Sequence, residues 1–315
     1  MTAADTDARP ALTIGEGGHR YGWVGDWAKL PEGKSFGFTH GVVTDKDDNV
    51  LIFNQSEDAV CVFDRDGHFL RSWGREYAKG AHGMFLGRAG DDEFLILTDY
   101  ELSAVYKTTL DGEVLWTITA PPMPEVYKAP EMFFPTDTCV APNGDVFVFD
   151  GYGQGWVNRY DRDAGYLGSF DGSTGAAGKF QCPHGGWVDT RGEEPLLLVA
   201  DRGNNRIQVF DLDLNYRDVI TEGLRFPCCF FQTGDEMVVP DLHARVTILD
   251  RDNRAIAQLG DTPGIWDYPQ WPDIPHAERQ PGHFLTPHAA CVDSRGDMYV
   301  VEFIPDGRVT KLIRT

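Results

Sequence analysis

Four histidines of this 315-residue chain share one sequence setting, and imidazoles that converge in space can bind a transition metal. Each histidine comes just before an apolar stretch that runs into an acidic or glycine-containing turn and then into a strongly hydrophobic segment. A residue type placed at equivalent points of a cyclic repeat faces a common axis, so we expect the four side chains to converge. They are His40, His82, His184 and His288.

The histidines belong to an internal repeat with a period of about 40–50 residues. Each unit holds short apolar or alternating runs bounded by turn residues, as expected for antiparallel strands. Six units start near residues 38, 80, 134, 182, 226 and 286. Four strands in each of six units predict an all-β fold, a six-bladed β-propeller of the NHL-repeat type.

The repeat leaves little of the chain unused, so we predict a single propeller domain over residues 11–315. Residues 1–10 are polar and are predicted to be a disordered N-terminus. We expect the ring to close by joining N-terminal residues, 12–14 or 21–23, to the strands of the last unit, because closure removes exposed sheet edges.

The composition of the chain limits the classes of molecule that it can bind. A formal net charge of −21 repels nucleic acid and anionic membranes, so we expect neither as a partner and a small molecule as substrate. The six cysteines contain no CxxC pair and are expected to be free thiols. No apolar run reaches the ~18 residues of a membrane span, and the start of the chain lacks a signal-peptide pattern. These features predict a cytoplasmic protein, and they indicate no oligomeric state.

Three of the four histidines fall in alternate units. His82, His184 and His288 lie in the second, fourth and sixth units, which a six-fold ring relates by about 120°. Three imidazoles around one axis predict a single divalent transition metal, with zinc expected for three neutral imidazoles and an open position. His40 would raise the count to four and favour iron, copper or nickel. Its alternatives are a group that contacts the substrate or a ligand, and a side chain that fills the channel.

On these motifs the sequence resembles the NHL-repeat propellers and, among them, the peptidyl-α-hydroxyglycine α-amidating lyases. The resemblance covers about residues 36–315 and is most specific at Pro183-His184 followed by residues 199–208. Enzymes of that family bind zinc through three histidines of alternate blades. The resemblance implies that Tyr152 is a base or oxyanion partner and that Arg202 is an electrostatic clamp. Arg202 could also be only the repeat's own turn, and Tyr152 a rim aromatic packed on Trp156.

The sequence departs from the family in the residues that would contact substrate. Gln55 stands where the lyases have an arginine, and Thr286 stands where they have a methionine before the last metal histidine. Ala289 replaces an acidic residue that helps to hold a structural calcium ion. We therefore assign Gln55 and Thr286 to substrate binding and expect weak or no activity on peptidyl hydroxyglycine.

A proline- and aromatic-rich stretch, residues 262–276, precedes the last unit. Long ordered loops in compact domains are usually functional, so Trp266 and Trp271 are predicted to cover and contact the substrate. Packing between blades, or a contact between subunits, is the alternative.

Together these features predict a metal-dependent lyase or hydro-lyase that acts on a hydroxylated small molecule, with His40, Tyr152 and Arg202 as catalytic residues. The alternatives are a metal-dependent hydrolase on the same scaffold and a non-catalytic NHL propeller that binds a protein partner.

Overall fold

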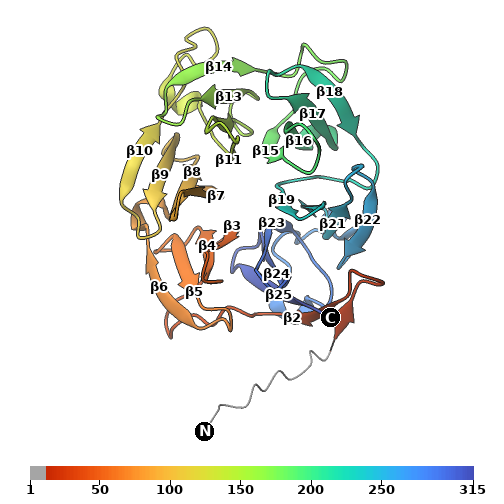
Figure 1. Ribbon diagram of the computed structural model, residues 1–315. Coiled ribbons are helices and arrows are strands. Elements are labelled where there is room, and N and C mark those ends of the chain that lie inside the picture. Colours follow the sequence, from red (N-terminus) through yellow and green to blue (C-terminus); the bar gives the residue numbers. More distant parts are fainter. Residues whose placement is uncertain (1–11) are drawn as a thin grey trace.

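Six antiparallel sheets surround a central channel in the computed structural model, which describes residues 12–315 (Figure 1). The predicted six-bladed β-propeller is therefore confirmed. Its six inner strands begin within five residues of the predicted unit starts, at residues 39, 81, 137, 183, 231 and 287. The disorder predicted for residues 1–10 lies outside the described residues.

Each of the first five blades is a four-stranded meander that runs from the channel to the periphery, although β19 is only a short inner strand. The first blade consists of β3 (Thr39–Thr44), β4 (Val50–Asn54), β5 (Val60–Phe63) and β6 (Phe69–Trp73). The second consists of β7 (Ala81–Ala89), β8 (Asp92–Asp99), β9 (Ala104–Thr109) and β10 (Val114–Ile118). The third blade consists of β11 (Asp137–Val140), β12 (Val146–Phe149), β13 (Val157–Tyr160) and β14 (Tyr166–Phe170). The fourth consists of β15 (Pro183–Asp189), β16 (Leu196–Asp201), β17 (Arg206–Asp211) and β18 (Tyr216–Ile220). The fifth is β19 (Phe231–Thr233), β20 (Glu236–Asp241), β21 (Arg245–Leu249), β22 (Ala255–Leu259).

The sixth blade combines both ends of the described chain. Its strands, from the channel outward, are β23 (Pro287–Val292), β24 (Met298–Glu302), β25 (Arg308–Arg314), β2 (Tyr21–Val24) and β1 (Thr13–Ile14). Trp23 of β2 pairs with Leu312 of β25, so the N-terminal segment supplies the outer strands. Both segments proposed for ring closure are used, and the last sheet has no exposed edge at β25.

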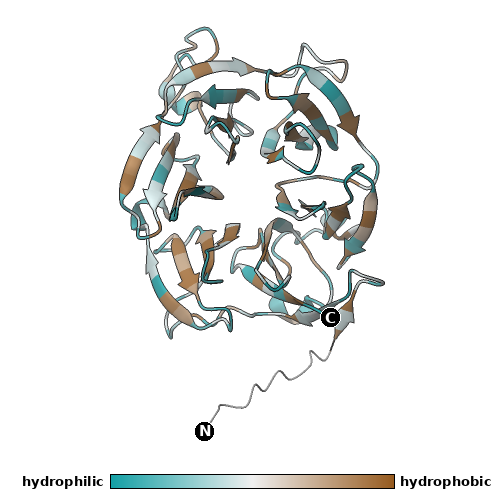
Figure 2. Ribbon diagram, viewed as in Figure 1, coloured by the Kyte–Doolittle hydropathy of each residue, from teal (hydrophilic) through white to brown (hydrophobic). Residues whose placement is uncertain are grey.

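The second strand of each blade is a continuous apolar run because adjacent blades cover both of its faces. Every residue of β4 is buried. Leu51 and Phe53 of β4 share one apolar cluster with Leu95 and Leu97 of β8, the corresponding strand of the next blade. The outer strands are partly exposed, and hydrophilic residues dominate the peripheral loops (Figure 2). The core is thus a set of blade-to-blade interfaces around the channel.

Helical structure within residues 12–315 is limited to short 3₁₀ turns: η1 (Arg75–Tyr77), η2 (Pro130–Met132), η3 (Arg202–Asn204), η4 (Ile265–Asp267) and η5 (His276–Glu278). No helix in this part of the chain is long and apolar enough to cross a membrane.

Candidate metal centre

A β-bulge occurs at each of the four histidines. The pairing of the first and second strands shifts register between Thr39 and Gly41, between Ala81 and Met84, between Pro183 and Gly185, and between Pro287 and Ala289. Each interval contains a histidine, so these histidines do not take part in the regular ladder. A bulge bends the strand and re-aims a side chain, and here the four imidazoles all turn into the channel.

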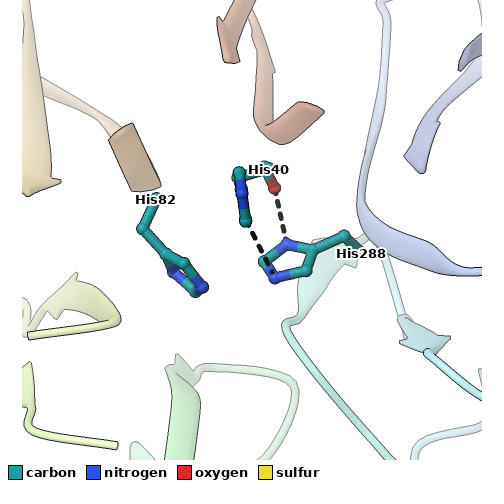
Figure 3. Close-up of side chains that lie close together, drawn as sticks. All are labelled: His40, His82 and His288. Carbon is teal, nitrogen blue, oxygen red and sulfur yellow. Dashed lines mark hydrogen bonds between the residues drawn. The ribbon is translucent and has the colours of Figure 1, made fainter. Parts of the chain in front are cut away.

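The four imidazoles form one buried cluster. Ring centroids of His82 lie 4.8 Å from those of both His184 and His288, and His184 lies 5.0 Å from His288. The ring of His40 is 4.5 Å from that of His82 and 4.6 Å from that of His288. Figure 3 shows His40, His82 and His288 directed toward one another from three separate strands. The structure therefore brings together all four histidines that the sequence singled out.

Main-chain carbonyl groups orient three of the rings in the same way. Nδ1 of His82 lies 2.6 Å from the carbonyl oxygen of Thr136, and Nδ1 of His184 lies 3.1 Å from that of Cys228. Nδ1 of His288 lies 2.8 Å from the carbonyl oxygen of His40. A carbonyl can only accept, so each Nδ1 carries the proton and each Nε2 keeps its lone pair. This is how proteins orient histidine ligands toward a metal.

The histidine cluster is electrostatically suited to a cation. Burial lowers the pKa of His82, His184 and His288, so the rings are neutral near pH 7. Burial also lowers the pKa of His40, and the neighbouring imidazoles add to this effect. Its Nε2 is buried and has no hydrogen-bond partner among residues 12–315. Neutral imidazole is the form that binds metal.

Potential ligand atoms within 4.8 Å of one another form two overlapping buried groups. One contains His40, His82 and His288, and the other contains His184, Cys228 and His288. The three predicted ligands are thus divided between two groups that share His288. Cys228 was expected from the sequence only to be a free thiol, and its sulfur adds a donor to the cluster.

Tyr152 reaches the histidines through its hydroxyl group. The phenolic oxygen lies 3.2 Å from Nε2 of His82 and 3.2 Å from Nε2 of His184. The residue as a whole is 42% exposed, so its ring is open to solvent on one side while the hydroxyl is deep in the site. Burial of the hydroxyl raises the pKa of Tyr152 to about 12, although the Arg202 cation opposes the shift. The phenol is therefore a neutral proton donor near pH 7.

Arg202 places an uncompensated positive charge beside Tyr152. It is 7% exposed, and its guanidinium lies 5.4 Å from the centre of the Tyr152 ring. Its Nη atoms contact the thiols of Cys182 and Cys228 at 3.4 and 3.7 Å, and no carboxylate of residues 12–315 pairs with it. Arg202 begins the 3₁₀ turn that the NHL pattern predicts, yet its side chain is directed toward the site.

Carboxylates at the ends of second strands fix the loops that carry these residues. Asp150 accepts hydrogen bonds from the main-chain N–H groups of Phe134 and Gln154 at 2.7 and 2.6 Å. Asp201 accepts one from Gln181 at 2.6 Å. Arg202 directly follows Asp201, and Tyr152 is two residues after Asp150, so their backbone positions are well defined.

The second blade holds Tyr100 directly after the corresponding aspartate, Asp99, and the sequence analysis did not identify this tyrosine. Its ring lies 5.9 Å from those of His82 and Tyr152, and its hydroxyl accepts a 2.8 Å hydrogen bond from Gln55. Gln55 thus faces the same rim as Tyr152. Its position directly after the acidic end of a strand, as in Asp99-Tyr100, is the signal that could have found Tyr100.

The predicted cover lies on the rim of the propeller that carries Arg202. Trp266 stacks on His243 at 4.7 Å, and His243 stacks on Phe226 at 4.6 Å. Phe226 in turn lies 4.9 Å from the Arg202 guanidinium. Trp271 donates from its indole nitrogen to the carbonyl oxygen of Leu285 at 3.1 Å.

Thr286 is the predicted site residue that the structure does not bring to the rim. Its side chain is fully buried, and its hydroxyl donates to the carbonyl oxygen of Phe303 at 2.8 Å. The hydroxyl is therefore engaged in holding the loop after β24.

Comparison with curated proteins confirms the resemblance to NHL-repeat proteins and to the amidating lyase. Human NHL repeat-containing protein 3 is 32% identical over 199 residues, which cover 59% of this chain and 55% of that protein. A probable peptidyl-α-hydroxyglycine α-amidating lyase of Caenorhabditis elegans is 23% identical over 202 residues, 64% of this chain and 53% of that protein. The chain spans about half the length of the curated relatives it matches. No family model matches the sequence.

Solved structures share the fold at low sequence identity. A streptogramin B lyase superimposes with a TM-score of 0.63 and 11% identity over 95% of this chain and 100% of that chain. A gluconolactonase from Xanthomonas campestris superimposes with a TM-score of 0.62 and 15% identity over 100% of this chain and 94% of that chain. These likenesses establish the propeller architecture.

Proposed function

We propose that the protein is a metal-dependent lyase or hydro-lyase that acts on a hydroxylated small molecule at the histidine cluster. The observation that carries the proposal is the repeated bond from Nδ1 of His82, His184 and His288 to a main-chain carbonyl of the following blade. It leaves three buried Nε2 lone pairs directed toward one axis. Sequence similarity to a probable amidating lyase supports the same reaction class.

The histidine cluster fits a divalent transition metal. His82, His184 and His288 would hold it, with His40 or Cys228 available as a further donor. Zinc suits a set of neutral imidazoles, and the added sulfur or fourth imidazole widens the choice to other late first-row metals. The bound ion would supply Lewis acidity, which lowers the pKa of a substrate hydroxyl or of water.

Tyr152 is positioned to move the proton that an elimination requires. In such a step the substrate hydroxyl loses its proton, the freed electron pair forms a carbonyl bond, the bond to the leaving group breaks, and the leaving group takes up a proton. The Tyr152 phenol can give that proton to the leaving group and recover one from the substrate hydroxyl, so atoms and charge balance over the cycle. Its contacts with Nε2 of His82 and His184 support this role.

Arg202 is positioned to stabilise negative charge. It is a buried cation without a carboxylate partner, 5.4 Å from the Tyr152 ring, and so it favours an oxyanion or phenolate beside it. We propose that Gln55, bonded to Tyr100, makes this rim less suited to an anionic peptide terminus than an arginine would. The proposed location is the cytoplasm, supported by six free cysteines.

Metal analysis of protein purified without a histidine tag tests the proposal. We expect about one equivalent of a transition metal, because the two overlapping groups of donors share His288. The variant in which His82, His184 and His288 are all alanine should contain none while it keeps its β-rich circular dichroism spectrum. His276→Ala, which changes an exposed histidine outside every group of potential metal ligands among the described residues, is the matched control. A wild-type protein that stays metal-free after supplementation, or a triple variant that retains its metal, would reject the proposed centre.

The chemistry is tested separately with hydroxylated substrates. An N-acyl-α-hydroxyglycine should be turned over slowly or not at all, whereas less anionic aromatic carbinolamines should lose their amine or amide and release an aldehyde that a carbonyl reagent detects. Metal-loaded protein with no lyase or hydro-lyase activity across such a panel would contradict the reaction class and leave the metal site intact.

A further inference from the structure

A cavity of about 490 Å³ occupies the part of the channel on the other side of the histidine cluster from Tyr152 and Arg202. Of the four clustered histidines, only His40 lines it. Its mouth is formed by the turns that follow the first strands, including Asp45, Asp48 and Ser294. Because the histidines start these strands and the turns end them, the cavity opens at the rim opposite the candidate active site. A volume of this size is typical of a small-molecule site.

Asp137, the first residue of β11, lies in the wall of this cavity. Glycines of the two neighbouring blades make room for its carboxylate. A methyl group on Gly83 would lie 2.8 Å from Oδ1, and one on Gly185 would lie 2.8 Å from Oδ2. Both glycines directly follow a histidine of the cluster. The carboxylate is therefore held in a close-fitting cradle between β7 and β15.

The carboxylate of Asp137 has no cationic partner. The residue is 7% exposed, and no lysine, arginine or histidine of residues 12–315 forms an ion pair with it. Burial raises its pKa to about 8, although the N–H groups of Thr138 and Gly186 oppose this shift. A buried carboxyl group of this kind is costly to ionise, and a cationic ligand would remove much of that cost.

The surroundings favour an organic cation over a metal ion. Phe85, Trp187 and Phe231 line the cavity, with Trp187 at 5.9 Å from each of the other two rings. Aromatic faces attract ammonium groups and also cover an apolar body. A calcium ion, by contrast, takes 6–8 oxygen ligands, and Asp137 belongs to no cluster of three potential metal-binding side chains among the described residues.

We propose that this cavity is a second ligand site, which binds a small primary ammonium compound with an apolar body. The ammonium group donates to the carboxylate of Asp137, and the body lies against Phe85, Trp187 and Phe231. Access from the opposite rim lets this site and the histidine cluster be occupied at the same time. The site is independent of the function proposed for the histidines.

Calorimetric titration with phenethylammonium in phosphate buffer tests the site, with phenethyl alcohol as the neutral counterpart. We expect the ammonium compound to bind and the alcohol to bind at least about tenfold more weakly, as the loss of a charge-assisted hydrogen bond implies. Asp137→Asn should weaken ammonium binding by a similar factor. Asp48→Asn makes the same charge change at the cavity mouth and should alter the affinity less than about threefold. Trp187→Leu, which keeps the carboxylate, should weaken binding of both compounds.

Three results would overturn the proposal. Equal affinity for the alcohol would mean that the cavity is only an apolar pocket. Calcium chloride that binds to wild-type protein but not to Asp137→Asn, and displaces the amine, would mean that Asp137 belongs to an inorganic ion site. A folded wild-type protein that binds no phenethylammonium would show that the cavity is not an amine site.

Discussion

The strongest stability prediction concerns Asp137→Asn. Burial raises the pKa of this carboxyl group from its ordinary value of 3.8 to about 8, so the folded protein retains a proton that the unfolded chain releases. A group whose pKa is raised by folding in this way makes the folded state less stable as pH increases from the unfolded to the folded pKa. Asparagine has nearly the same shape and does not ionise, so the variant should lose this dependence.

The size of the effect follows from the same values. At pH 7 the unfolded chain is ionised and the folded protein is mostly protonated, and the gap from 3.8 to 7 corresponds to about 4 kcal/mol of lost stability as an upper limit. We expect Asp137→Asn to be more stable than wild type at pH 7 by a few kcal/mol. Near pH 4 the two proteins should be about equally stable, and the difference should grow by up to about 1.4 kcal/mol per pH unit until about pH 8.

Urea unfolding of both proteins at several pH values, in a buffer without amines, measures this difference. Asp48→Asn is the control with the opposite sign. Burial acts to raise the pKa of Asp48, but its hydrogen bonds with Ser294 outweigh that and lower it. Asp48 therefore stabilises the folded protein above its ordinary pKa and loses this effect as pH falls. A stability difference for Asp137→Asn that does not change with pH, or that favours wild type at pH 7, would refute the interpretation of Asp137 as a buried carboxyl group without a cationic partner.

Three further predictions concern the candidate metal centre. His82→Ala should abolish metal binding. His40→Ala should retain more metal, because the carbonyl group that orients Nδ1 of His288 belongs to the main chain and remains, although the 3.4 Å contact of the His40 ring with Nε2 of His288 is lost. Metal content is measured by mass spectrometry, and equal loss in both variants would contradict this. Tyr152→Phe should reduce kcat by about 10²–10⁴-fold at unchanged metal content, and a wild-type rate would exclude Tyr152 as the proton carrier. Arg202→Lys keeps the charge but not the planar group and should retain more activity than Arg202→Ala; equal kcat/KM for both variants would show that the charge at this position is unimportant.

The sequence was sufficient for the fold because repetition determines it. Each unit repeats the same order of apolar run and turn, so the inner strands could be located to within five residues. The four histidines could be grouped for the same reason. Their convergence on the channel was also expected from the repeat, but the bulges that direct them there were not, because a bulge depends on how the first strand pairs with the second and no residue type marks it.

Contacts between blades were the other part that the sequence could not supply. Asp137 sits between Gly83 and Gly185, which lie about 50 residues away on either side of it in the chain. Thr286 was assigned to substrate binding because it replaces a methionine of the resembled family, but its hydroxyl is buried and donates to the carbonyl group of Phe303. Equivalent positions of the repeat occupy the same place in their own blades, but their side chains can point in different directions.

The alternation of blades explains why only three histidines occupy equivalent roles. The second, fourth and sixth blades contribute the imidazole, whereas the third, fifth and first contribute a main-chain carbonyl from Thr136, Cys228 and His40. A carbonyl group is common to every residue type, so the side chains at these three positions are not constrained by that role and differ from one another. This frees the thiol of Cys228 to lie among the potential ligand atoms, and it leaves Nε2 of His40 buried without a hydrogen-bond partner among the described residues. These two side chains are therefore the ones that could adjust the number and softness of the donors around an ion bound at the histidine cluster.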